Sequence, residues 1–210
     1  MARKSTIAYS RSRGAFTNKR GTIFKGVCRP RGRNRRCSLF RGRAGLIAGA
    51  RTDANITAHV NSNAPLDPDS ASIIECIQAN GITVVKKQAQ VPVHDSRTRT
   101  ATRIDLLCRR GAREPFVIEV KTTSMTSAAH AASYKTKIDP VTPTYKLDLT
   151  RDTVEHTVYA EHYNQLTNTM ALFARTKRMR PGRVLHGAIV MHCRADATTV
   201  FYPISITVPA

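Results

Sequence analysis

The uneven distribution of charge most limits what this chain can fold into. The first 51 of its 210 residues contain 15 Lys and Arg and no Asp or Glu, whereas the other 159 residues contain 19 basic and all 14 acidic residues. Hydrophobic side chains before residue 46 are too few to offset the entropy lost on ordering. We therefore expect a basic, largely disordered arm over residues 1–65, with room for a helix at 46–60, and a folded core over residues 66–210.

The net charge of +20 indicates a polyanionic partner, and we expect DNA, whether duplex, branched or single-stranded. Two basic clusters are candidate nucleic-acid contacts: Arg31, Arg33, Arg35 and Arg36 in the arm, and Arg175, Lys177 and Arg178 near the end of a predicted helix. Each cluster has a second explanation. The arm also fits a nuclear localisation signal, and cations at a helix C-terminus complement the helix dipole.

The cysteines and the lack of long apolar runs favour an intracellular protein without a membrane span. Five cysteines make an odd count with no Cys-x-x-Cys, and no apolar run approaches about 18 residues. Cys28 and Cys37 lack paired histidines for zinc, and four suitably placed cysteines for an iron–sulfur cluster are missing. We expect nuclear localisation if the source is a eukaryote or its virus, with an organelle transit peptide as the alternative for the basic start.

Hydrophobic periodicity in the core predicts an α/β fold in the order α-β-β-β-α-β-β, a mixed central sheet flanked by helices. Five segments have strand character: residues 82–93, 102–108, 116–121, 184–193 and 198–206. A helix is expected over residues 70–79, and a long one over residues 153–177. Residues 124–152 have a weak pattern, for which we expect a short helix and a loop.

Acidic residues interrupt two of these apolar strands. Asp105 lies within Arg-Ile-Asp-Leu-Leu, and Glu119 lies within Phe-Val-Ile-Glu-Val-Lys, which ends at Lys121. Residues two apart in a strand share a face, so Glu119 and Lys121 project together, and a hairpin can place Asp105 beside them. Two carboxylates and an ammonium around one point suit a hard divalent cation and the charge that develops in phosphodiester hydrolysis. These three residues are therefore the candidate catalytic residues, with both acids binding the cation.

This arrangement resembles the PD-(D/E)xK, or restriction-endonuclease-like, nuclease superfamily, in which an Asp on one strand precedes Glu-x-Lys on the next. Here Asp105 is followed by Glu119-Val120-Lys121, and Ile104 stands where the family name has Pro. The resemblance implies a restriction-endonuclease-like core that binds Mg²⁺ or Mn²⁺. In many members an upstream helix carries a further Glu near the metal, and Glu75 occupies that place in this sequence.

The helix beyond Lys121 carries a partial match to a further family feature. RecB-like exonucleases have Gln-x-x-x-Tyr there, and this chain has Gln165 but Thr169 in place of Tyr. The run Glu-Val-Lys-Thr-Thr is also similar to small nuclease-like nuclear proteins of herpesviruses, which fits a viral origin. We add Gln165 to the candidate nucleic-acid contacts, interpret His162 as an ordinary helix-face histidine, and leave endonuclease and exonuclease action open.

The function that the sequence favours is a Mg²⁺- or Mn²⁺-dependent deoxyribonuclease. A homodimer is compatible with it, since nucleases that cut both strands often work as symmetric dimers. One alternative is a catalytically silent DNA-binding or packaging protein that keeps the nuclease fold. Another is a ribosome-associated or histone-like basic protein, which leaves the acids inside apolar strands unexplained.

Overall fold

A computed structural model of the chain describes residues 7–10, 15–19, 22–26, 43–135 and 158–208. Its helices are α1 (Arg43–Ser62), α2 (Pro68–Ala79), α3 (Ser127–Lys135) and α4 (Val158–Thr176). Its strands are β1 (Ile7–Ser10), β2 (Ala15–Asn18), β3 (Ile23–Gly26), β4 (Ile82–Asp95), β5 (Thr100–Arg110), β6 (Glu114–Thr123), β7 (Val184–Cys193) and β8 (Thr198–Thr207). No helix in these ranges is long and apolar enough to cross a membrane.

The five long strands form a mixed sheet in the order β4-β5-β6-β7-β8. The pairs β4–β5, β5–β6 and β7–β8 are antiparallel hairpins, whereas β6 and β7 run parallel. The chain passes through α3 and α4 between these two parallel strands, as a parallel pair requires a long connection. The α/β class and the mixed, helix-flanked sheet that the sequence predicts are therefore confirmed.

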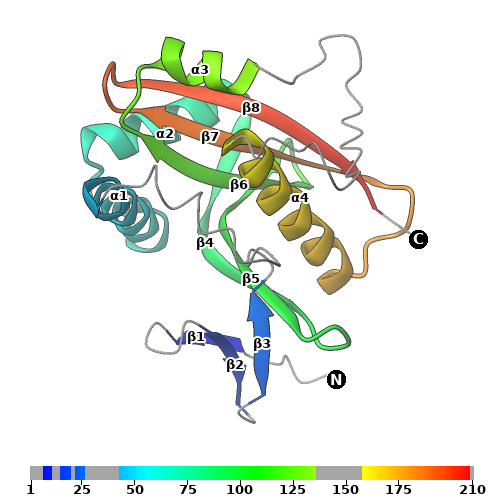
Figure 1. The fold of residues 1–210 in the computed structure, drawn as a ribbon. Coiled ribbons are helices and arrows are strands. Elements are labelled where there is room, and N and C mark those ends of the chain that lie inside the picture. The colour runs from blue at the N-terminus through cyan, green and yellow to red at the C-terminus, as the bar shows by residue number, and fades with distance from the viewer. Residues whose placement is uncertain (1–6, 11–14, 20–21, 27–42, 136–157, 209–210) are drawn as a thin grey trace, which may run out of the picture.

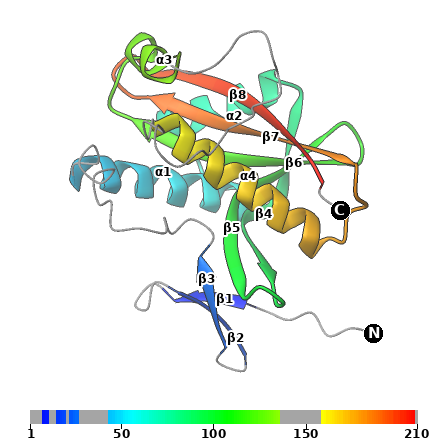
Figure 2. The same cartoon turned by 45° about the vertical axis from the view of Figure 1, so that its right-hand side comes forward.

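Helices cover both faces of the sheet, with α1 and α2 on one face and α4 on the other (Figures 1 and 2). Successive residues of β6 alternate between the two faces: Val117 packs with α4, whereas Ile118 packs with α1 and α2. Buried side chains that pack on the α4 face are Leu166, Met170, Phe173, Ile189 and Met191. Those that pack on the other face are Ile56, Val60, Ile73, Ile77, Phe116 and Val190.

The sequence predicts a largely disordered arm over residues 1–65. In the parts of this segment that the structure describes, the chain instead forms three strands and a helix. Strands β1, β2 and β3 form an antiparallel ladder, and β3 pairs in parallel with β5 at Lys25–Thr100 and Gly26–Ala101. Phe16 and Phe24 are buried together with Ala101 of β5. The few hydrophobic residues of this region cannot form a core alone, but they are buried against the larger sheet.

The helices of the core lie close to the positions that the sequence predicts. The helix expected at residues 70–79 is α2, which begins at Pro68 because Asp67 caps it by accepting from Ser70 N. Part of the long helix expected at 153–177 is α4, while residues 153–157 lie outside the described ranges. The helix that the sequence allowed at 46–60 is longer, since α1 spans Arg43–Ser62.

Replacement of Gly187 should test how closely α4 sits on the sheet. A Cβ at this β7 position would lie 2.5 Å from Val117 O and 3.0 Å from Met170 Sδ, so the strand or the helix must move. We expect Gly187→Ala to lower the free energy of unfolding by about 1–3 kcal/mol, as for other overpacked cores. Chemical denaturation measures this change. Gly45→Ala, where a Cβ has open space in α1, is the control and should leave stability unchanged or slightly raised; equal effects would contradict the packing described.

Candidate active site

The edge of β5 that faces β6 divides into two halves at Asp105. Residues Leu106 to Arg110 pair with β6, from Ile118 back to Glu114. Before this ladder, β5 leaves β6, and the same strand pairs with β3 at Thr100 and Ala101. Beyond Ile118, β6 continues only along β7. Strands β5 and β6 therefore form a fork (Figures 1 and 2). Asp105 and Glu119 follow directly beyond the last backbone pair between these strands, Leu106–Ile118.

The Asp105 side chain takes the place of a backbone acceptor of its own strand, β5. The amide of Val120 donates to Asp105 Oδ2 at 3.0 Å, just past the last backbone pair between the two strands. Gln90 Nε2 donates to Oδ1 at 3.3 Å, and Gln90 itself has a left-handed backbone with φ of 52°. Each carboxylate oxygen is thus held by one donor, which fixes the orientation of the group and leaves lone pairs for a further ligand.

Glu119 is a buried carboxylate, with 1% of its surface exposed. Lys121, two residues further along β6, and Gln165 of α4 both donate to its Oε1. The sequence-predicted pairing of Glu119 with Lys121 is therefore present, and Gln165 reaches the same carboxylate from the helix above the strand. Burial and the negative charge of Asp105 raise the pKa of Glu119 to about 7, although Lys121 opposes this.

Asp53 is a third acid at the fork, and the sequence analysis missed it. It lies on α1, and the charges that act on it include those of Asp105, Lys121 and Arg103. Part of its surface is open to solvent, yet desolvation by the surrounding protein and the charge of Asp105 raise the pKa of Asp53 to about 6. The close approach of α1 to β6 makes this possible, since a Cβ at Gly49 would lie only 3.4 Å from Thr122 Oγ1.

A signal for Asp53 was present in the sequence. It is the first acidic residue of the chain, and it precedes Ile56 by three residues and Val60 by seven, so all three share one side of a helix. Ile56 and Val60 are buried against the sheet, which turns this side of α1 toward β6.

Glu75 does not approach the fork, contrary to the sequence-based expectation. Its side chain is exposed on α2, which contacts β4, β7 and β8, and it is not among the charges that act on Glu119 or Asp53. The helix ahead of the first long strand is the wrong source for the extra acid, because α2 packs across the sheet away from the fork. Asp53 of the preceding helix lies there instead.

The remaining predicted residues are dispersed. Arg175, Lys177 and Arg178 are exposed near the end of α4, and Arg175 Nε lies 3.9 Å from Asp95 Oδ2. The arm residues Arg31, Arg33, Arg35 and Arg36 lie outside the described ranges. His162 is buried on α4, in keeping with its interpretation as a helix-face histidine.

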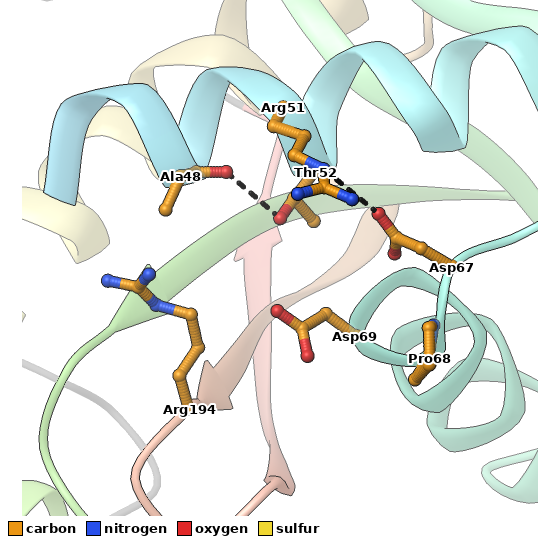
Figure 3. A pocket seen from close by; sticks show the side chains of 7 residues that line it. All are labelled: Ala48, Arg51, Thr52, Asp67, Pro68, Asp69 and Arg194. Atoms are coloured by element: carbon orange, nitrogen blue, oxygen red, sulfur yellow. Dashed lines mark hydrogen bonds and ion pairs between the residues drawn. The ribbon is translucent and has the colours of Figure 1, made fainter. Parts of the chain in front are cut away.

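A small pocket of about 220 Å³ lies close to the fork, between α1, the start of α2 and the end of β7. Figure 3 shows Arg51 of α1 and Arg194, which follows β7, on either side of acids at the start of α2. Those acids have structural partners: Asp67 caps α2, and Asp69 Oδ1 lies 3.3 Å from His192 Nε2. The mixed charges balance within the pocket, so the fork remains the stronger candidate for chemistry.

The acids at the fork come from three elements, Asp53 from α1, Asp105 from β5 and Glu119 from β6. In the described residues no group of three or more His, Cys, Asp or Glu side chains is already close enough to hold a metal ion. Comparison of the chain with protein-family models and with curated proteins finds no match. The assignment of function therefore depends on the geometry of the fork.

Replacing Glu119 by Gln should remove a pH dependence from the stability of the protein. The pKa of Glu119 is about 7 in the folded state and 4.5 as an ordinary group, so folding favours the protonated form. The resulting stabilisation is complete below about pH 4.5 and is lost as pH rises through about 7. In a chelating buffer, we expect the free energy of unfolding of the wild type to fall by roughly 2–3 kcal/mol from about pH 5 to about pH 8.

Glu119→Gln keeps the shape of the side chain and should lose most of this fall. Chemical denaturation of both proteins over the same pH range measures the difference. Asp53 titrates in both proteins, and because its charge acts on Glu119, the difference also contains the loss of repulsion between these two acids. Parallel pH profiles for the two proteins would show that Glu119 is not the titrating group.

Proposed function

We propose that this chain is a divalent-cation-dependent nuclease that hydrolyses DNA phosphodiester bonds at the β5–β6 fork. The observation that carries the proposal is the convergence of Asp105, Glu119 and Lys121 at the point where the two strands separate. Acids with raised pKa values next to a lysine are typical of sites that bind a cation or move a proton. The proposal agrees with the restriction-endonuclease-like resemblance of the sequence and with the strongly basic composition.

Asp105 and Glu119 would hold a Mg²⁺ or Mn²⁺ ion, with Asp53 as the third acid in place of Glu75. The donor set would suit such an ion, because hard cations prefer carboxylate oxygens. Burial and, after it, repulsion by the charge of Asp105 raise the pKa values of Asp53 and Glu119. Bound there, the ion would supply Lewis-acid stabilisation for the charge that develops on the phosphate. Binding a cation relieves the repulsion that the folded protein otherwise tolerates.

The other polar side chains of the fork have separable tasks. Lys121 donates to Glu119 and is only partly exposed, so its ammonium is held near the reacting phosphate and can meet negative charge there. Gln165 positions the Glu119 carboxylate from α4, and Val120 N and Gln90 position that of Asp105. These donors preorganise both acids before substrate binds.

The rival function is a DNA-binding or packaging protein that keeps this fold without turnover. One observation favours it: Lys121 and Gln165 both bind Glu119 Oε1, so the protein itself already satisfies that oxygen. The two functions differ in a single assay, the cleavage of labelled DNA with Mn²⁺ in the presence and absence of a chelator.

Substitutions of Asp105 and Lys121 test the nuclease proposal. Asp105→Asn should abolish cleavage while DNA binding in chelator is kept, because the amide cannot hold the cation. Lys121→Met keeps similar bulk without the charge, so single-turnover cleavage should slow by roughly 10² or more with little change in binding. Wild-type cleavage rates in both variants would refute the site. A wild type that binds DNA but never cuts would favour the packaging function.

Asp53→Asn compared with Glu75→Gln tests which helix supplies the third acid. Both changes remove one negative charge from a helix beside the sheet, but only Asp53 acts on Asp105 and Lys121. We expect Asp53→Asn to raise the Mn²⁺ concentration needed for half-maximal cleavage by about tenfold or more, the usual effect of weakening a ligand shell. Glu75→Gln should match the wild type. The reverse pattern would restore Glu75 as the site residue.

A further inference from the structure

A basic groove of about 400 Å³ lies on the α4 face of the sheet, remote from the residues assigned to chemistry. Its floor includes Leu107 of β5 and Phe173 of α4. Four exposed cations line it: Arg109 of β5, Arg113 of the β5–β6 turn, Lys177 after α4 and Arg183 before β7. The groove therefore lies between the end of α4, the β5–β6 hairpin and the loop that precedes β7.

The groove carries positive charge without compensation. No acidic residue lines it, and within the described ranges none of the four cations takes part in an ion pair. The nearest acid in sequence, Glu114, has its Oε1 3.3 Å from His186 Nε2. Complementing the dipole of α4 explains Lys177 alone. Four like charges around one apolar-floored groove repel each other, and a bound polyanion relieves that repulsion.

The groove and the Glu119 carboxylate lie on the same face of the sheet, the face that α4 covers. Leu107 pairs with Val117, which packs with α4, and Glu119 is two residues further on the same face of β6. Phe173 follows Gln165 by eight residues on α4, which is about 12 Å along the helix. In Figure 2, α4 runs across the sheet.

We propose that the groove holds the phosphodiester backbone of a nucleic-acid strand whose scissile bond lies at the fork. The phosphates contact the four cations, and the apolar floor contacts the sugars. The inference rests on the proposed function for the identity of the strand, but its binding contribution is measured without cleavage. It makes the end of α4 and the β5–β6 turn a second anchoring point for the substrate.

Neighbouring basic residues provide a matched control. Arg109 lines the groove, whereas Arg110 lies on the opposite face with its guanidinium 4.9 Å from the Phe116 ring centroid. Lys177 lines the groove, whereas the exposed Arg180 does not. The double variants Arg109→Gln/Lys177→Gln and Arg110→Gln/Arg180→Gln therefore remove the same charge from the same two segments. Only the first pair changes the groove.

Binding of labelled single-stranded and duplex oligonucleotides to the full chain is measured in chelator over a range of salt concentrations. The groove variant should bind roughly tenfold more weakly near 0.1 M salt, and the slope of log affinity against log salt should fall by about 1.4 on single strands or about 1.8 on duplex. The control variant should keep wild-type affinity and slope. Circular dichroism and thermal unfolding check that both variants are folded.

Three results would overturn the inference. One is an equal loss of affinity in both variants, which would mean that only net charge matters. Another is wild-type affinity and slope in the groove variant. The third uses inorganic phosphate as a probe: if millimolar phosphate stabilises the wild type but not the groove variant, while oligonucleotide binding is equal in the two, the groove takes free phosphate. Failure of the nuclease proposal is seen separately, as a wild type that binds DNA without cutting it.

Discussion

The hydrogen bond from Val120 N to Asp105 determines the arrangement on which the rest of the site depends. In a continuous ladder this amide would donate to a backbone carbonyl of β5, but here a side-chain carboxylate accepts it and β5 leaves β6. A buried amide without a partner would be costly, so the Asp105 carboxylate stabilises the separated strands. The fork and the position of its first acid therefore have one physical cause.

Burial of Glu119 is the second constraint, because an ionised carboxylate in an apolar interior is destabilising unless it is paired. Lys121 and Gln165 provide the pairing from β6 and α4. Asp105 and Asp53 act in the opposite direction, since their charges raise the pKa of Glu119. Repulsion among the three acids therefore persists at the fork, although the sheet around it is well packed. Carboxylates with perturbed pKa values of this kind are typical of functional sites.

Two groups among the basic residues of the described chain have different surroundings. Arg175 approaches Asp95, and Arg51 approaches Asp67, so these residues balance acids at the surface. Arg109, Arg113, Lys177 and Arg183 have no such acids and surround one groove. Net charge alone does not separate these groups, because the difference lies in which cations the fold brings together and which it pairs.

The sequence by itself determined the elements of the core and the pairing of Glu119 with Lys121, since strand periodicity and apolar flanks are local properties. Tertiary structure alone decided that β1, β2 and β3 extend the sheet beside β5 and that Asp53, not Glu75, reaches the fork. Sparse hydrophobic residues predict disorder when considered by themselves, yet they fold where a larger surface buries them. Which helix directs an acid at a strand depends on packing between distant segments, and this packing has no local signature.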